Sequence, residues 1–398
     1  MAPAMAKAKR SRARAAVVGL LIGSLLLSGV LEARTAQAAG VARRAVAVLT
    51  SDAQDLRLLA FWVALGSGEF AREGLDVHVT AVDSPAALRS AFASGAAPAA
   101  LLAGNDYERL ISDRVPFVLA ANLLQNDPTE IVVRRDIFRR LGINERMPAA
   151  QRLAALRGVT LGVAVPDRGR LYQLFRSQGV DADIASLTVR KGGEQIAELE
   201  GGSLDAAYLA TPYLEKALDH DAVVLLDVAG GDIPLFAERM IEALGVSSAF
   251  AKAQPADVRG LVRGIAKAEH TIRFDPAAAT MAVIRALPNV ERAHAARIVS
   301  LYGRAVPATP HVEAQLIKRE AGFYPVGGEV LSLAGVDFSA YVVDPSLGAA
   351  ATPSATGAPS SQRMLVLFGA LALLIALLVV IADQREAPAG AGSRDETI

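Results

Sequence analysis

The 398-residue chain contains no cysteine, which excludes disulfides, thiolate nucleophiles and zinc–thiolate or iron–sulfur sites. Its 41 basic and 41 acidic residues cancel, but six basic residues and one acidic residue lie in residues 1–38, so the remainder carries a net charge of −5. A mildly acidic body has no electrostatic reason to bind nucleic acid. The five scattered histidines predict no compact histidine-based metal site, while a carboxylate cluster stays open as an alternative. No cofactor is expected.

The N-terminus has the three parts of a secretory signal peptide in order. A basic stretch at 7–14 precedes an apolar run at 15–31, and a small-x-small cleavage sequence follows at 36–38. The apolar run is short for a membrane span. We therefore expect residues 1–38 to be a cleaved signal and the body to be exported to the periplasmic or extracellular face of the membrane. An uncleaved anchor helix is the alternative.

Residues 44–132 alternate short β runs with helical patterns, as layered α/β structures do. The apolar run at 45–50 predicts a buried strand, and the alternating run at 75–82 predicts a second. Gly74 would end the helix between them. The remaining expected elements of this part are strands at 99–102, 117–122 and 130–134, and helices at 55–73, 86–93 and 106–112.

Residues 159–227 repeat the same scheme of strand, helix, strand, helix, short strand and helix. The expected strands are 159–165, 186–190, 206–209 and 223–227, and the expected helices are 171–178, 194–200 and 212–218. Residues 248–343 are mainly helical by their apolar spacing, and one helix begins near Pro255. Two similar α/β units in one chain predict two lobes with a cleft between them.

The C-terminal part predicts a tether to a membrane. Residues 344–362 are rich in Ala, Pro, Ser, Thr and Gly, which favours a flexible linker. The uncharged apolar run at 364–382 would span about 28 Å as a helix, close to the ~30 Å hydrocarbon core. We expect a single transmembrane helix over 363–383, with its start outside the cell because the body is exported, and a polar tail over 384–398.

Five stretches resemble one family of binding proteins, which takes up sulfonates, taurine, nitrate and thiamine-pyrimidine precursors. They occur in the family's order and at fitting spacing. They are GEFAREGLDV at 68–77, AFASGAAPAA at 91–100, NDPTEIVVRR at 126–135, LAALRGVTLGVAV at 153–165 and GGSLDAAYLATPY at 201–213. The chain departs from the family pattern at Pro98, where an aspartate is common.

The resemblance implies a type II periplasmic binding protein fold, with two α/β lobes, a two-strand hinge and the ligand between the lobes. Lobe one would comprise 44–132 and 237–343, and lobe two would comprise 135–228. The crossings would fall near 132–134 and 228–231, where Gly230 and Gly231 suit a hinge. The implied function is capture of a small molecule for an ABC importer, and the implied partners are its permease and ATPase.

Candidate ligand-binding residues follow strand ends, because ligands of open α/β sheets bind beyond the carboxyl ends of strands. The candidates are Ser51, Asp52, Gln54, Asn105, Asp106, Gln125, Asn126, Arg168, Gly169, Thr211 and Tyr213. Arg168 beside a helix N-terminus favours a sulfonate-like or carboxylate anion, although it could instead pair with Asp167 or face solvent. Asp52 and Asp106 favour a cationic solute, unless they are helix caps.

Two other function classes are the alternatives to a transport protein. A tethered sensor or docking protein without a transport role would explain the C-terminal span, which importer capture subunits usually lack. An enzyme is not expected, because the chain has no G-x-S-x-G, P-loop or H-E-x-x-H motif. The enzymes that share this family's fold and make the thiamine pyrimidine carry a cysteine-rich motif, and this chain has no cysteine.

Overall fold

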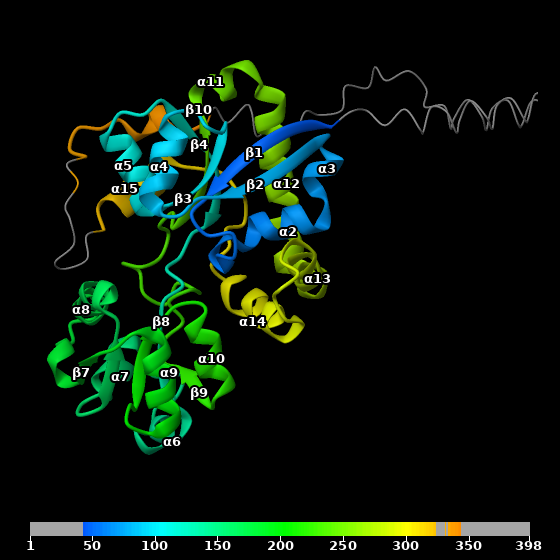
Figure 1. Ribbon diagram of the computed structural model, residues 1–398. Coiled ribbons are helices and arrows are strands. Elements are labelled where there is room, and N and C mark those ends of the chain that lie inside the picture. Colours follow the sequence, from blue (N-terminus) through cyan, green and yellow to red (C-terminus); the bar gives the residue numbers. More distant parts are fainter. Residues whose placement is uncertain (1–42, 324–330, 332, 344–398) are drawn as a thin grey trace, which may run out of the picture. The chain divides into compact units, whose positions relative to one another are not determined.

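The computed structural model describes residues 43–323, 331 and 333–343 (Figure 1). The expected signal peptide at 1–38, linker at 344–362, transmembrane helix at 363–383 and tail at 384–398 lie outside these residues. Among the described helices, none combines the length and the apolar character that a bilayer span requires. All described residues belong to one compact unit of the chain.

The first of two five-stranded sheets has the order β2-β1-β3-β10-β4. Strand β1 runs parallel to β2 and β3, while β10 returns from far along the chain and runs antiparallel to β3 and β4. The strands are β1 (Arg44–Thr50), β2 (Leu75–Ala81), β3 (Ala99–Ala103), β4 (Phe117–Leu124) and β10 (Glu242–Ser247). No element is expected from the sequence over the residues of β10.

Helices cover both faces of this sheet. One face packs on α2 and the long α12 to α14, and the other on α4, α5 and α15. The helices and short helical turns are η1 (Leu56–Leu58), α2 (Leu59–Ser67), α3 (Glu69–Arg72), α4 (Pro85–Ala93), α5 (Gly104–Ser112), α11 (Ser248–Ala253), α12 (Pro255–Phe274), α13 (Pro276–Ala286), α14 (Arg292–Tyr302), α15 (Ala314–Ala321) and η4 (Phe338–Tyr341). The helix expected at 55–73 is broken at Gly68, whose φ of 76° is left-handed and ends α2.

The second sheet has the order β7-β6-β8-β5-β9, and β5 runs antiparallel to both of its neighbours. Its strands are β5 (Glu130–Arg134), β6 (Thr160–Val163), β7 (Ser186–Val189), β8 (Ala206–Leu209) and β9 (Ala222–Val224). Its helices and turns are α6 (Arg135–Arg140), α7 (Ala149–Ala154), η2 (Val165–Asp167), α8 (Arg168–Ser177), η3 (Ala182–Ile184), α9 (Gly192–Gly201) and α10 (Tyr213–Asp219).

The chain passes between the two sheets twice. Strand β4 ends at Leu124 in the first sheet, and β5 begins at Glu130 in the second. The return runs from Val224 at the end of β9 to Glu242 at the start of β10 (Figure 1). The mixed sheets with helices confirm the expected α/β class. The expected C-terminal transmembrane helix lies outside the described residues.

Candidate functional site

Two adjoining cavities lie where loops from both sheets meet. The first has a volume of about 440 Å³, and the second, of about 660 Å³, shares Arg57 and Ala210 with it. The polar side chains of the first lining are Arg57, Asn105, Glu108, Arg109, Thr129, Asp167, Arg170 and Glu320. Two of them follow a strand within a few residues: Asn105 comes two residues after the end of β3 at Ala103, and Asp167 four residues after the end of β6 at Val163. The cavity therefore lies at strand ends, as in other open α/β sheets.

The N-terminus of α5 opens onto the first cavity. Its N-cap residue, Ala103, has no side chain that could accept the free N–H groups of the first turn, and the exposed Asn105 stands in that turn. Gly104 lets the Glu320 side chain approach the start of α5, since a Cβ at this position would lie 2.6 Å from Glu320 Oε1. The N–H of Gly104 donates to the Ile241 carbonyl at 3.0 Å, and the positive end of the dipole of this nine-residue helix favours an anion in the cavity.

Arg57 lies between the two cavities. It belongs to η1, which Asp55 caps by accepting from the backbone N–H of Arg57 at 2.9 Å. The guanidinium binds the Asp55 carboxylate with two nitrogens, at 3.0 and 2.5 Å, and its Nη1 lies 3.1 Å from Glu242 Oε1. These two carboxylates fix the guanidinium in place, and 37% of the side chain stays exposed toward the cavities.

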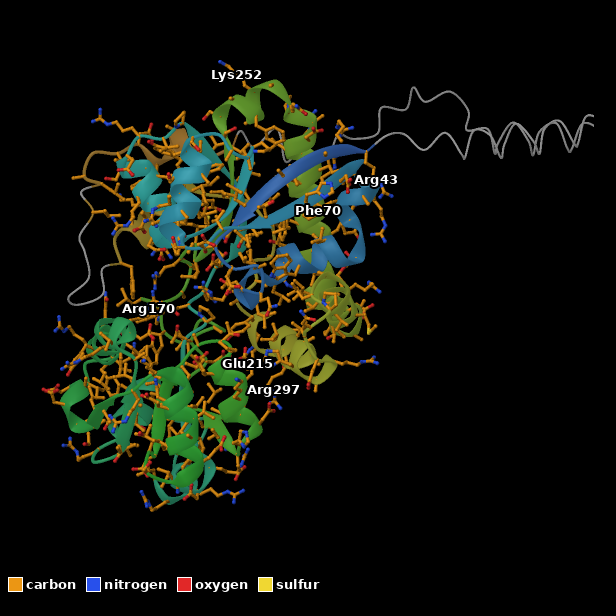
Figure 2. All side chains as sticks on the ribbon, viewed as in Figure 1. Arg43, Phe70, Arg170, Glu215, Lys252 and Arg297 are labelled. Atoms are coloured by element: carbon orange, nitrogen blue, oxygen red, sulfur yellow. The ribbon has the colours of Figure 1, made fainter. Side chains whose placement is uncertain are left out.

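Arg170, on α8 beside the second sheet, lines the first cavity. Arg170 is labelled in Figure 2. Its Nη1 lies 3.1 Å from Oδ2 of Asp127, in the segment that joins β4 to β5. Asp127 is fully buried. Burial opposes its ionisation, but the charges of Arg170 and Arg239 outweigh that effect and lower the pKa of Asp127. The pair therefore connects α8 with the first of the two crossings.

A buried cluster around Arg239 contacts the wall of the first cavity. Arg239 is 1% exposed, and its guanidinium lies 2.7 Å from Glu320 Oε2 and 3.5 Å from Asp127 Oδ2. Its Cζ also stacks 3.3 Å from the ring centroid of Phe323. Because Glu320 and Phe323 both line the cavity, Arg239 positions two wall residues without reaching the cavity itself.

The electrostatics of the two cavities differ. In the first, burial and the neighbouring Glu320 raise the pKa of Glu108 to about 8, so this carboxyl is mostly protonated at neutral pH. Burial likewise raises the pKa of Asp167. Burial also raises the pKa of Glu320, so the first lining holds three arginines, Arg57, Arg109 and Arg170, against carboxyl groups whose ionisation burial opposes. The second cavity holds three carboxylates beside Arg57 and His294: Asp52, Asp55 and Glu291. An anionic ligand fits the first cavity better than the second.

Four of the eleven residues expected at the site line these cavities. Asn105 lines the first, while Asp52, Gln54 and Thr211 line the second. The other seven lie outside both linings: Ser51, Asp106, Gln125, Asn126, Arg168, Gly169 and Tyr213.

Several of these seven have a structural partner. Asp106 is buried and pairs with Arg89 at 2.5 Å. The Asn126 side chain donates to the Ala229 carbonyl at 2.8 Å and accepts from the Glu238 N–H at 3.0 Å. Arg168 is exposed and donates to the Tyr172 hydroxyl at 3.4 Å.

The sequence reasoning missed the arginines that line the first cavity. It placed an anion-binding arginine at the start of the helix after β6, where the sequence reads Arg168-Gly169-Arg170. Two residues along a helix are about 200° apart, so only one of the two arginines can face the cavity. One sequence signal could have indicated the position of Arg57: Asp55, two residues earlier, is a residue type that caps helices, and it caps η1 here.

The arrangement defines the class: two mixed α/β layers joined by two crossings have the fold of type II periplasmic binding proteins. The Escherichia coli periplasmic aliphatic sulphonate binding protein SsuA is similar, at 14% identity and TM-score 0.52, over 76% of this chain and 92% of that chain. So is the periplasmic sulfonate-binding protein SsuA of Methylobacillus flagellatus KT, at 12% identity and TM-score 0.53, over 77% and 93%. These identities establish the fold alone.

A family model assigns the chain more narrowly. Residues 60–287 match the model of the NMT1-like family, so the chain belongs to that family. The resemblance recognised in the sequence is confirmed by this match and by the sulfonate-binding structural neighbours. Comparison with curated proteins finds no match.

Proposed function

We propose that the protein is an exported solute-binding protein that captures a small sulfonate-like anion between two lobes and delivers it to an ABC importer. The observation that carries the proposal is the convergence of Arg57, Arg109, Arg170 and the N-terminus of α5 on one cavity of about 440 Å³. The sulfonate-binding proteins with the same fold support the choice of ligand class.

The magnitudes agree with a small-anion ligand. A helix N-terminus stabilises a nearby anion by about 0.3–1 kcal/mol near the surface, and by up to about 2 kcal/mol when partly buried. Hydrogen bonds from guanidinium groups are roughly twice as strong as neutral ones. Arg57 and Arg170 are already held by Asp55 and Asp127, so little side-chain entropy is lost when an anion binds.

The proposed mechanism is closure around the ligand. Lobe one, 44–132 and 237–343, contributes Arg57 and α5, and lobe two, 135–228, contributes Arg170. An anion that contacts both sets binds the closed state better, and only this difference in affinity shifts the equilibrium. The two crossings would form the hinge, and Gly231, at a φ of 95°, suits the second crossing.

The tether and the transport partners are also part of the proposal. A transmembrane helix over 363–383 would replace a lipid anchor and raise the local concentration of the body at the permease. The alternative, a tethered sensor or docking protein, predicts ligand binding without a permease. Co-purification with a permease and ATPase favours transport, and turnover of a bound ligand by the purified chain would make the protein an enzyme.

The test is a thermal-shift series on the full chain in detergent, with sulfonates, nitrate, carboxylates, thiamine-pyrimidine precursors and amines. A ligand at 100 times its Kd adds about 2.7 kcal/mol to the stability. We expect an anion to stabilise the chain and Arg170→Gln to abolish that shift. Arg168→Gln, two residues away on the same helix, is the matched control and should keep it. Stabilisation by amines alone would contradict the proposal.

A further inference from the structure

A third cavity lies against the free edge of the second sheet. It has a volume of about 1050 Å³ and is lined by Arg135, Phe138, Arg139, Ile143, Asn144, Glu145, Arg146, Arg152, Leu218, Ala222, Val223, Val224, Leu225 and Arg297. We name it the β9 groove, because all three residues of β9 line it. None of its residues lines the two cavities of the candidate ligand site.

Strand β9 has unpaired backbone groups on its outer side. It is the last strand of its sheet and pairs only with β5. The backbone N–H of Leu225 donates to Ile131 at 2.8 Å, and that of Arg135 donates to Asp221 at 3.0 Å. Antiparallel pairs alternate, so Ala222 and Val224, between these bonded positions, direct their N–H and C=O groups away from β5. Among the described residues, these groups have no backbone partner.

The groove has an apolar wall on each side of this edge. Phe138 and Ile143 belong to the core on the α6 and α7 face of the sheet. Leu218 and Val224 are partly buried and pack against the core on the α10 face. A strand added beside β9 would place alternate side chains against the two walls, as the period of a β-strand requires.

The rim of the groove is basic. Five arginines line it, with Glu145 as the single acidic lining residue. Three of them have carboxylate partners: Arg135 with Asp221, Arg152 with Asp232 and Arg297 with Asp219. Arg139 and Arg146 are exposed and have no ion pair with any described residue. These two charges are available to an incoming partner.

We propose that the β9 groove binds an acidic, extended peptide segment of a partner protein, which pairs with β9 as a sixth strand. The free N–H and C=O groups give main-chain hydrogen bonds, and the two apolar walls select alternate side chains. The unpaired arginines select acidic residues at the other positions. An anionic membrane surface would satisfy the arginines but not the backbone edge, which lies within the groove, so the observations favour a peptide.

The first experiment uses the wild-type full chain and fluorescently labelled peptides in an anisotropy titration. The probe is an eight-residue peptide of alternating Glu and Val, and the controls are its Lys–Val counterpart and a Glu–Val peptide N-methylated at alternate amides. We expect only the unmodified Glu–Val peptide to bind, with an affinity that falls as salt rises. Equal binding of either control peptide, or no binding of the probe, would overturn the proposal.

The second experiment uses matched variants. Removing the two unpaired charges with Arg139→Ala and Arg146→Ala together should weaken binding roughly 3- to 30-fold. Arg140→Ala is the control, since Arg140 is exposed on the same helix but does not line the groove. Val224→Pro removes the outward N–H together with the valine's contribution to the apolar wall. An edge strand tolerates the proline, and binding should weaken about tenfold. The proposed strand pairing would be contradicted if Arg140→Ala weakened peptide binding as much as the double variant does. It would also be contradicted if the full chain bound anionic vesicles but not the Glu–Val peptide.

Discussion

The ion pair between Arg170 and Asp127 allows a quantitative test of how α8 is held at the first crossing. Arg170→Met removes the guanidinium and keeps most of the side-chain length. Breaking a fully buried pair costs about 3–5 kcal/mol. Here Arg170 is 30% exposed and Arg239 remains 3.5 Å from the same carboxylate, so we expect a smaller loss of about 1–3 kcal/mol at pH 7.

The pH dependence of this loss identifies its cause. The pKa of Asp127 is lowered in the folded state, so its contribution to stability is present above the unfolded pKa of about 3.9 and is lost as pH falls through the folded value. The difference between wild type and Arg170→Met should therefore shrink below about pH 4. A loss of stability from a change in helix packing alone would stay constant with pH.

Urea unfolding of the full chain in detergent, followed by tryptophan fluorescence, measures both quantities. Arg168→Met is the matched control and should change the free energy of unfolding by less than about 0.5 kcal/mol, because Arg168 is exposed and donates to Tyr172, whose hydroxyl in turn donates to Asp183. Equal losses in the two variants, or a loss in Arg170→Met that is the same at pH 3 and pH 7, would refute the reasoning.

Three further predictions concern residues around the cavities. Gly104→Ala should lower stability by about 1–3 kcal/mol in urea unfolding, because the new Cβ meets Glu320; an unchanged midpoint would contradict this. The raised pKa of Glu108 makes the stability of the wild type fall between about pH 4.5 and 8, and Glu108→Gln removes this fall. The free energy of unfolding of Glu108→Gln minus that of the wild type should therefore rise over this range and then stay level. A difference that is constant with pH would exclude the raised pKa. Trp62→Phe should cost about 1–3 kcal/mol by thermal unfolding, since the 2%-exposed indole donates to the Asp55 carbonyl at 2.7 Å; a loss near zero would mean that this bond contributes little.

The layered fold could be predicted from the sequence because its signals are local. The apolar run at 45–50 and the alternating run at 75–82 correspond to β1 and β2, and the run at 159–165 contains β6. The sequence did not indicate that Gly68 ends the first helix, because a glycine can also lie inside a helix. Strand β10 depends on pairing with β3 and β4, which lie more than a hundred residues earlier, so no local pattern indicated its partners.

The candidate site was predictable to the level of segments but not of side chains. Strand ends and helix starts indicated Asn105 and the turn at 167–169, because the topology of α/β sheets places ligands there. Which arginine faces the cavity depends on the rotation of α8 against Asp127, and this follows from tertiary packing. Asp106 and Asn126 have the residue types of ligand contacts, but their partners Arg89 and Ala229 are distant in sequence.

The most direct test of the account is a distance measurement between the two lobes. The chain has no cysteine, so Ser94→Cys in lobe one and Ser177→Cys in lobe two give two unique spin-label positions, both exposed. Pulsed electron resonance on the full chain should show a shorter, narrower distance distribution when the anion that stabilises the chain most is added, and no change in the Arg170→Gln variant. A distribution unaffected by a bound anion would contradict closure around the ligand.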